Sequence, residues 1–469
     1  MPNEPTDLDS GTSGQEDGVA LSLSGGGYRA MIFHVGALYR LNEVGLLGKL
    51  SRISSVSGGS ITAGFLGLVW DKLEFDKAGK AANFSLLVEG MRAMADTTVD
   101  AGAVMGGILL PGSISDRVAD AYDEVLFKGA KLRDLPDDTG KKAPRFVINA
   151  TNIKSAVLWR FSRPYMGDYR VGLVDAPDVK LSTAVAASSA FPPILSPLTM
   201  PISQPVRPTK GADLNRPTYT TEAVLSDGGV YDNLGLETVK RFSTLLVSDA
   251  GQKIAPQEHP DHDWARHSLR VLDTIDNQVR SLRKRYLIES YERGDHTGTY
   301  WGIRTNFADY GLQSDPLGCL KRNPKPLAEI PTRLEKMPRD RQDRLMNCGA
   351  TRFATPRCVP MSMPNCRLSS RSRSPRAADS PSLEATDRAK ARNVKGRNHG
   401  QAIAIFLRRI EKPGEDTAEI DRRRCSSRMR QRHRRSAHSP LLKSAAEHFL
   451  FRPELRQVRR QLHGHLSES

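Results

Sequence analysis

The first 73 residues alternate between short apolar strands and helices, and this alternation constrains the fold more than any other feature. Residues 18–24 alternate apolar and small side chains as a strand does, and apolar residues recur at helical spacing over 30–44. A second strand, 52–56, and a second helix, 58–73, follow. Such alternation is typical of an α/β fold with a parallel sheet and helices on its faces. Ligands of such sheets bind at the carboxyl ends of the strands.

Further patterns continue this organisation along the chain. Strands are predicted at 146–153, 157–161, 223–226, 245–248 and 300–305, and helices at 180–190, 264–293 and 326–346. Residues 74–128 are expected to be mainly helical and contain an apolar run at 104–111, which is too short to span a bilayer. This run is interpreted either as a buried helix end or as a lid over a lipid site.

A serine stands at the turn between the second strand and its helix. Ser57 is flanked two positions away by Ser55 and Gly59, and small residues are needed there when a strand-to-helix elbow projects a nucleophilic serine. The following helix would direct its N-terminal N–H groups toward negative charge that develops beside Ser57. An ordinary Gly/Ser turn before a helix is the alternative for this stretch alone.

Two further motifs lie at predicted strand ends. The triplet Gly25-Gly26-Gly27 exposes backbone N–H groups, as an oxyanion hole does. A phosphate cradle is the alternative, but Ala30 occupies the last glycine position of the dinucleotide-binding pattern, and no Lys-Ser/Thr pair follows as in a P-loop. Asp227, followed by two glycines, supplies a carboxylate at a tight turn. Asp249 occupies a similar strand end, so the residues alone leave two candidate bases.

Histidine and cysteine usage narrows the chemistry. His34 lies on the apolar first helix and is interpreted as a core histidine, so no histidine is placed where a Ser-His-Asp triad would need one. A serine activated directly by a carboxylate is therefore favoured. The five cysteines form no CxxC pair, and we expect neither a metal site nor a cofactor.

Charge divides the chain into a neutral body and a basic tail. Residues 351–469 carry 27 Lys and Arg against 11 Asp and Glu, which equals the whole net charge of +16. We therefore expect a disordered segment at 1–17, one folded domain at 18–347 and a largely disordered Arg/Ser/Pro-rich tail at 348–469. The neutral body argues against nucleic-acid binding. No signal peptide or transmembrane run is visible, and a cytoplasmic location is the expectation.

These motifs together resemble the patatin-like phospholipase family. The matching residues are Gly25-Gly26-Gly27-Tyr28-Arg29 for its glycine-rich motif, Ser55-Val56-Ser57-Gly58-Gly59 for its GxSxG elbow and Asp227-Gly228-Gly229 for its Asp-Gly-Ala/Gly motif. Residues 187–193 resemble its small-residue segment that ends in prolines. The resemblance covers about 18–240, and more loosely extends to 346. Ser55 replaces the first elbow glycine, and Ala30 closes the glycine motif.

The resemblance implies a three-layer α/β/α fold with a mostly parallel central sheet, and a lipid acyl hydrolase acting on phospholipids or other acyl lipids with peripheral membrane contact. Ser57 would be the nucleophile and Asp227 the base, with Gly25, Gly26 and Gly27 as the oxyanion hole and Arg29 as its electrostatic support. Ser55, Gly58, Gly59, Gly228 and Gly229 would shape the elbow and the aspartate turn. The alternative is a non-catalytic lipid-binding or membrane-binding protein on the same fold.

Overall fold

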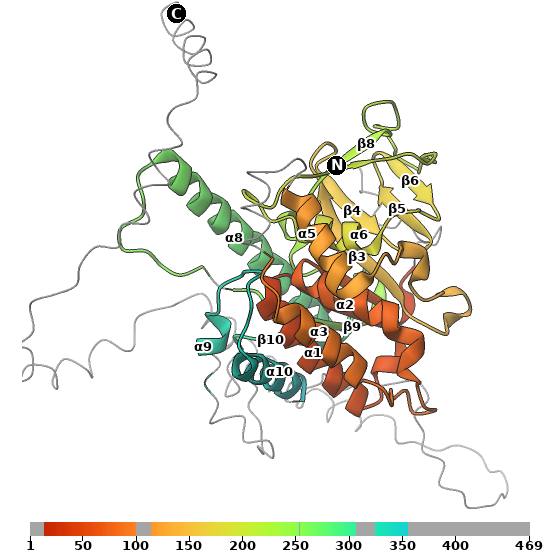
Figure 1. Cartoon of the computed structure of the whole chain (residues 1–469), viewed down its shortest axis with the longest axis vertical. Helices are drawn as coiled ribbons and strands as arrows, with labels where there is room; N and C mark the ends of the chain where they lie inside the picture. The colour runs from red at the N-terminus through yellow and green to blue at the C-terminus, as the bar shows by residue number, and fades with distance from the viewer. Residues whose placement is uncertain (1–13, 100–113, 253, 306–322, 324, 355–469) are drawn as a thin grey trace, which may run out of the picture. The chain divides into compact units, whose positions relative to one another are not determined.

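The computed structural model describes residues 14–99, 114–252, 254–305, 323 and 325–354. Its centre is a ten-stranded sheet (Figure 1). Five neighbouring strands run parallel in the order β10 (Thr297–Gly302), β9 (Phe242–Asp249), β1 (Glu16–Leu23), β2 (Leu50–Val56) and β3 (Arg145–Asn152). The segment 104–111 lies outside the described residues.

The other half of the sheet is antiparallel. β4 (Val157–Phe161), β5 (Tyr165–Asp168) and β6 (Gly172–Asp175) follow β3 in sequence as well as in space. β8 (Glu222–Asp227) pairs antiparallel with β3 and with β7 (Leu198–Pro201). The expected α/β class is confirmed, but the sheet is mixed rather than mostly parallel. The turns between the consecutive strands β3, β4, β5 and β6 are too short for the crossover connection that a parallel pair of strands requires.

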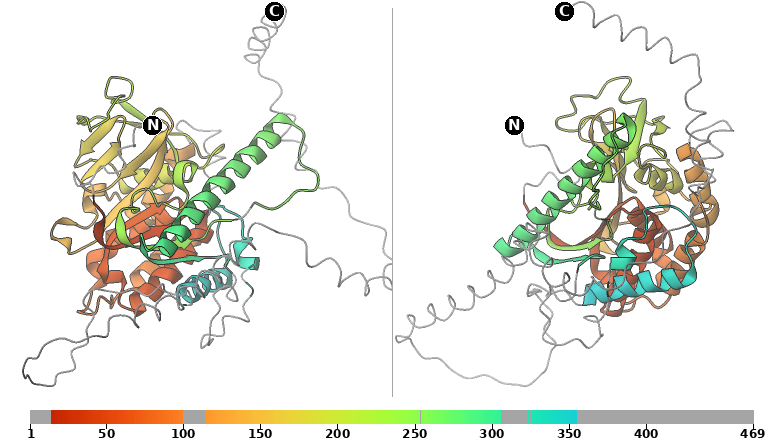
Figure 2. Two further views of the ribbon diagram at one scale, coloured as in Figure 1. Left: turned by 180° about the vertical axis from the view of Figure 1, so that it is seen from behind. Right: turned by 90° about the vertical axis from the view of Figure 1, so that its left-hand side faces the viewer.

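Helices cover both faces of the sheet, which gives the three expected layers (Figures 1 and 2). Packed together on one face are α1 (Gly27–Glu43), α2 (Gly58–Val69), α3 (Ser85–Ala95), α5 (Ile114–Tyr122), α6 (Leu181–Ser188) and α10 (Arg339–Ala354). The other face carries α7 (Gly229–Asp232) and α8 (Trp264–Arg293). Each face of the sheet has its own hydrophobic core: the first core lies under α1 and its neighbours, and the second lies under α7 and α8. Alternate residues of β9 point into the two cores, Leu246 into the first and Leu245 and Val247 into the second.

The folded part differs from the expected boundaries at both ends. β1 begins at Glu16, inside the segment 1–17 that was expected to be disordered, because its strand pairs with β9 from that residue. α10 crosses the expected boundary at 347/348 and continues to Ala354. It follows Pro338, and the helix predicted over 326–346 is therefore two helices, α9 (Lys325–Ala328) and α10. Residues 1–13 and 355–469 lie outside the described part.

Glycines bring α10 into backbone contact with α1. A Cβ on Gly36 would lie 1.9 Å from the Met346 carbonyl oxygen, and one on Gly349 would lie 2.0 Å from the Phe33 carbonyl oxygen. Only glycine permits so close an approach of two helices. α10 therefore covers the helix whose first turn carries the glycine motif.

Candidate active site

Ser57 occupies a strained turn between β2 and α2. Its φ is 52° and its ψ −122°, a region that non-glycine residues rarely adopt, and its side chain is nearly buried. A Cβ on Gly58 would lie 2.1 Å from the Gly27 carbonyl oxygen, and one on Gly59 would lie 2.5 Å from the Leu23 carbonyl oxygen. The two glycines thus let the elbow lie directly against the glycine loop that follows β1.

Strand β3 brings Asp227 to Ser57, although 170 positions separate them in sequence. Val56, the residue before Ser57, pairs with Asn149 of β3, and Asp227 pairs with the next residue, Ala150. β8 runs antiparallel to β3, so its carboxyl end returns to the end of β2. A Cβ on Gly228 would lie 2.3 Å from the Asn149 carbonyl oxygen, which explains the glycine after the aspartate.

Asp227 is buried and only partly hydrogen-bonded. Its Oδ1 accepts the Gly229 N–H at 2.6 Å, whereas its Oδ2 makes no hydrogen bond to any described residue. Burial raises the pKa of Asp227 to about 7, and the Gly229 N–H and the Ser57 hydroxyl oppose that rise. The Ser57 hydroxyl is therefore near the Asp227 carboxylate but does not form a direct hydrogen bond to Oδ2. Such long catalytic contacts are common in unliganded sites.

The three glycines of the loop before α1 have different surroundings. The Gly25 N–H donates to the Asn233 carbonyl oxygen at 3.1 Å, so it is already used. Gly26 and Gly27 have φ values of 141° and 58°, and their N–H groups meet no acceptor among the described residues. Both lie at the N-terminus of α1, where unpaired N–H groups favour negative charge.

Arg29 is fully buried beneath this loop. Its Nε donates to the Ala250 carbonyl oxygen at 3.0 Å, and Nη1 donates to the Ile330 carbonyl oxygen. A Cβ on Gly26 would lie 2.9 Å from Nη2. Arg29 Nη1 also lies 3.4 Å from Gln252 Oε1. Arg29 therefore joins the glycine loop to two neighbouring segments, through two backbone carbonyls and one side-chain amide.

Asp249, the competing base, has a different environment. Its Oδ2 accepts the Tyr300 hydroxyl at 2.6 Å and Arg280 Nη2 at 3.3 Å, and its Oδ1 accepts the Gly251 N–H at 2.8 Å. Although burial opposes ionisation, Arg280 and Tyr300 lower the pKa of Asp249 to about 2. A carboxylate that is ionised and fully paired is a poor proton acceptor near neutral pH.

His34 is a core histidine, as predicted. Its Nε2 lies 2.9 Å from the Ser24 carbonyl oxygen and its Nδ1 lies 2.9 Å from the Ser248 hydroxyl. Burial lowers the pKa of His34 to about 4, so the ring is neutral at pH 7. It braces the strand ends beneath the glycine loop.

Ser188, at the end of α6, is a site residue to which the sequence analysis assigned no role. Its hydroxyl accepts the Ser57 N–H at 2.9 Å and donates to the Asn149 carbonyl oxygen at 2.6 Å. The Ser60 hydroxyl lies 2.9 Å from it and donates to Ser55 Oγ at 3.0 Å. The Ser188 carbonyl also accepts the Gly228 N–H at 3.2 Å. One residue thus supports both the elbow and the aspartate turn.

Asn233 is a second residue without a predicted role. A Cβ on Gly25 would lie 2.4 Å from Asn233 Oδ1 and 3.1 Å from Ser57 Cβ, and one on Gly229 would lie 3.0 Å from Asn233 Oδ1. The amide of Asn233 therefore lies between the glycine loop and the aspartate turn. Asn233 stands six residues after Asp227 in sequence. It returns to the site only because the chain turns between β8 and α7, so its sequence position was the one signal that could have indicated its role.

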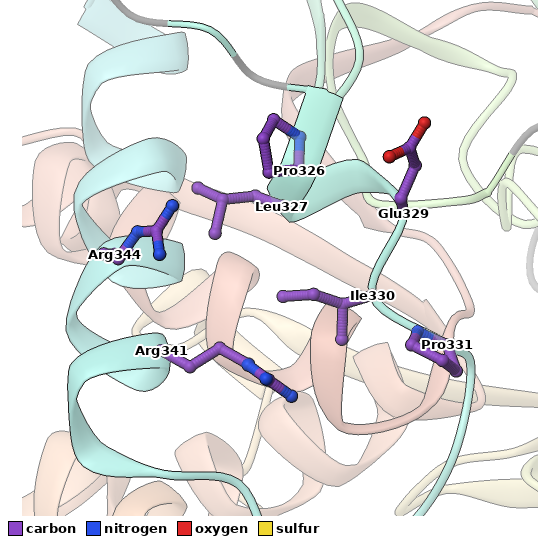
Figure 3. Close-up of a pocket in the computed structure, with 7 residues that line it drawn as sticks. All are labelled: Pro326, Leu327, Glu329, Ile330, Pro331, Arg341 and Arg344. Carbon is purple, nitrogen blue, oxygen red and sulfur yellow. The ribbon is translucent and has the colours of Figure 1, made fainter. Parts of the chain in front are cut away.

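A pocket of about 330 Å³ lies elsewhere, between the α9 segment and α10 (Figure 3). Leu327 and Ile330 face Arg341 and Arg344 across it. Neither Ser57 nor Asp227 lines it. Among the described residues, no group of three or more His, Cys, Asp and Glu side chains is placed to hold a metal ion.

Comparison with known proteins agrees with the motifs. Human GIVD cytosolic phospholipase A2 in complex with methyl gamma-linolenyl fluorophosphonate inhibitor and terbium chloride is 13% identical with a TM-score of 0.42, over 72% of this chain and 57% of that chain. VipD from Legionella pneumophila is 15% identical with a TM-score of 0.29, over 72% and 66% of the two chains. No curated protein sequence matches the chain. The family model of patatin-like phospholipases matches residues 21–240, and this part of the chain is a patatin-like phospholipase domain.

Proposed function

We propose that the protein hydrolyses fatty-acyl ester bonds of lipids through a Ser57–Asp227 dyad. The observation that carries this proposal is the buried Oδ2 of Asp227, which lies beside a strained serine elbow and has no hydrogen-bond partner among the described residues. A carboxyl group whose pKa is raised to about 7 can both take and return a proton near neutral pH. The match of the family model to residues 21–240 supports lipid acyl esters as the substrate class.

The proposed reaction has two acyl-transfer steps. Asp227 Oδ2 takes the proton of the Ser57 hydroxyl as Oγ attacks the ester carbonyl carbon, and the tetrahedral oxyanion accepts hydrogen bonds from the Gly26 and Gly27 N–H groups. The alcohol leaves with the proton from Asp227, and Ser57 keeps the acyl group. Asp227 then takes a proton from the water that attacks the acyl-enzyme, and it returns that proton to Ser57 Oγ as the fatty acid is released. No cofactor is needed.

Exposed apolar side chains beside the dyad support a lipid substrate. Phe191 directly follows Ala190, whose carbonyl accepts the Asp227 N–H, and Val230 follows Gly229, whose N–H binds Asp227. Phe191, Ile194 and Val230 are 51%, 54% and 49% exposed. Large apolar residues gathered around polar catalytic groups favour an acyl chain at this edge.

The dyad is tested with a fluorophosphonate probe and a short-chain soluble ester. The probe should label Ser57 of the wild-type chain, and both Ser57→Ala and Asp227→Asn should lose ester turnover by at least about a thousandfold. Asp249→Asn is the matched control at a carboxylate that the dyad does not use, and it is assayed at a temperature at which circular dichroism shows the variant to be folded. Retained turnover in Ser57→Ala would refute the nucleophile. A folded wild-type chain that takes no label would favour the non-catalytic lipid-binding protein.

A further inference from the structure

The helix α8 carries an apolar stripe that no described residue covers. Val271, Ile275, Val279, Leu282 and Tyr286 recur at spacings of three and four, so they lie on one side of the helix. Trp264 lies on the same side, two turns before Val271. These six residues, here called the α8 stripe, are between 37% and 83% exposed. The stripe is about 33 Å long at 1.5 Å per residue.

The opposite side of α8 fastens it to the body through its second half. Leu287 and Tyr291 join the second core, and the Tyr291 hydroxyl donates to the Leu245 carbonyl oxygen at 2.9 Å. Arg280 pairs with Asp249, and Arg283 Nη1 pairs with Glu237 at 3.2 Å. The α8 stripe therefore faces away from the body, on a helix that is held in place.

Topology puts the free half of α8 beyond the catalytic edge of the sheet. α8 connects the parallel neighbours β9 and β10, so it runs back against the strand direction. Arg280 is level with Asp249, the last residue of β9, and the residues before Arg280 extend past that edge by up to about 24 Å. The views agree that α8 projects from the sheet (Figures 1 and 2). Ser57 follows β2 at the same edge.

The charge of α8 favours a negatively charged partner surface. From Trp264 to Tyr286 the helix carries five Arg and one Lys against Asp273 and Asp276. Arg266, Arg280 and Arg283 pair with carboxylates outside this stretch, so the charge that can face a partner comes from the remaining basic residues. His267 and Arg285 lie beside the stripe on one flank and are exposed. Apolar residues with an aromatic ring at each end and basic residues on the flank are typical of a helix that lies in a lipid interface.

We propose that the α8 stripe docks on the surface of an anionic lipid bilayer and holds the catalytic edge against its substrate. The inference deepens the proposed function and rests on it, because a lipid acyl hydrolase must reach ester bonds at a membrane surface. No described helix is both long and apolar enough to cross a membrane. Docking from one side of α8 matches that finding, since only a stripe of the helix is apolar.

The chain offers a local reporter for this docking. Of its four tryptophans, Trp70, Trp159 and Trp301 are buried, whereas Trp264 is 83% exposed at the free end of the stripe. Vesicles of phosphatidylglycerol and phosphatidylcholine should shift Trp264 fluorescence to shorter wavelength, and brominated lipid should quench it. The signal should be absent in Trp264→Phe and weaker with phosphatidylcholine alone. A wild-type chain whose tryptophan emission ignores anionic vesicles would overturn the proposal.

A variant of the stripe tests the functional link. The triple change Ile275→Gln, Val279→Gln and Leu282→Gln should weaken vesicle binding by at least about tenfold and lower hydrolysis of vesicle lipid in parallel. Turnover of a soluble short-chain ester should not change. The matched control is Tyr39→Gln with Val44→Gln, which removes apolar side chains of 46% and 45% exposure at the far end of α1, away from the catalytic edge. Equal vesicle binding by the triple variant and the control would overturn the proposal.

Two readouts keep this inference separate from the proposed function. Ser57→Ala should retain the Trp264 shift while it loses all hydrolysis. Hydrolysis of soluble ester without a Trp264 shift would leave the dyad standing and refute docking. A triple variant that changes oligomeric state, with no vesicle response in the wild-type chain, would assign the stripe to contact with a second copy and also refute the proposal.

Discussion

At the scale of single residues, Asp227 should set the pH dependence of the reaction. Its ionised form is the proposed base, and burial raises the pKa of Asp227 to about 7. We expect kcat/KM for a soluble ester to fall about tenfold per pH unit below that pKa, and to level off above it. A profile that stays flat down to pH 5 would show that the group that takes the proton does not have a raised pKa. The ordinary pKa of an aspartate would place the acid limb near pH 4.

The same carboxylate should lower the stability of the fold when it ionises. Because the pKa of Asp227 is higher in the folded chain than in the unfolded one, the unfolding free energy falls as pH rises through about 4 to 7. Asp227→Asn keeps an oxygen for the Gly229 N–H and removes the buried charge. Its melting temperature should therefore exceed that of the wild-type chain at pH 8, and the difference should vanish near pH 4.

Ser188 should act as a positioning residue for the nucleophile. Ser188→Ala leaves the buried Ser57 N–H without its 2.9 Å acceptor, and about 1–3 kcal/mol of support for the strained elbow is lost. We expect kcat and the rate of fluorophosphonate labelling to fall by at least about tenfold, with KM little changed. Ser189→Ala is the control, because among the described residues its hydroxyl binds only the Val185 carbonyl oxygen of its own helix. Equal losses in both variants would indicate general destabilisation.

Candidate residues with distinctive local chemistry could be proposed from the sequence, whereas residues whose contacts depend on position could not. Ser57 and Asp227 stand in turns that small neighbours mark, and the glycine loop is marked in the same way. Ser188 has no such mark, because its role depends on a hydroxyl that binds the Ser57 N–H, 131 positions away in sequence. Gly25 was expected in the oxyanion hole, but its N–H is used by Asn233, a contact that no local pattern reveals.

At the scale of secondary-structure elements, Asp249 and Arg280 should hold α8 in place. The pair is buried and is the link between the end of β9 and the middle of α8. Asp249→Asn removes one partner and should lower the unfolding free energy by about 3–5 kcal/mol at pH 7. The pKa of Asp249 is depressed to about 2, so this stabilisation is present above pH 4 and is lost as pH falls toward 2. Hydrogen exchange should rise in α8 first.

Unchanged hydrogen exchange in the variant would mean that the Asp249–Arg280 pair does not hold α8. If Asp249→Asn left exchange in α8 unchanged, the helix would be held by its other contacts, chiefly Leu287 and Tyr291 in the second core. Arg280→Met with Asp249→Asn completes the cycle, since removal of both charges should restore part of the lost stability.

The helical elements were more predictable than the sheet. The range predicted for α8 agrees with its bounds, because a long periodic segment ends at a glycine. The short strands β5, β6 and β7 were not predicted. They are only four residues each, too few to establish a period of two, and β8 joins the sheet by antiparallel pairing with a strand far away in sequence. The mixed character of the sheet follows from these long-range pairings.

At the scale of the whole molecule, we expect that catalysis requires the chain up to the end of α10 and nothing beyond it. A chain that ends after Ala354 keeps every described contact of the dyad, the glycine loop and α1. We expect it to label with fluorophosphonate and to turn over soluble ester as the full chain does. A chain that ends after Pro338 lacks α10 and exposes the first core at Gly36, where α10 lies in backbone contact with α1.

Loss of α10 should abolish both fluorophosphonate labelling and ester turnover, because it also removes the buried side chains of Leu345 and Cys348. A buried leucine alone contributes about 1.5–3 kcal/mol, and a domain is stable by only about 5–15 kcal/mol. A cut after residue 347, the boundary that composition indicates, falls inside α10 and should give an intermediate melting temperature. Full activity in the chain that ends at Pro338 would show that α1 and its glycine loop hold their geometry without this helix.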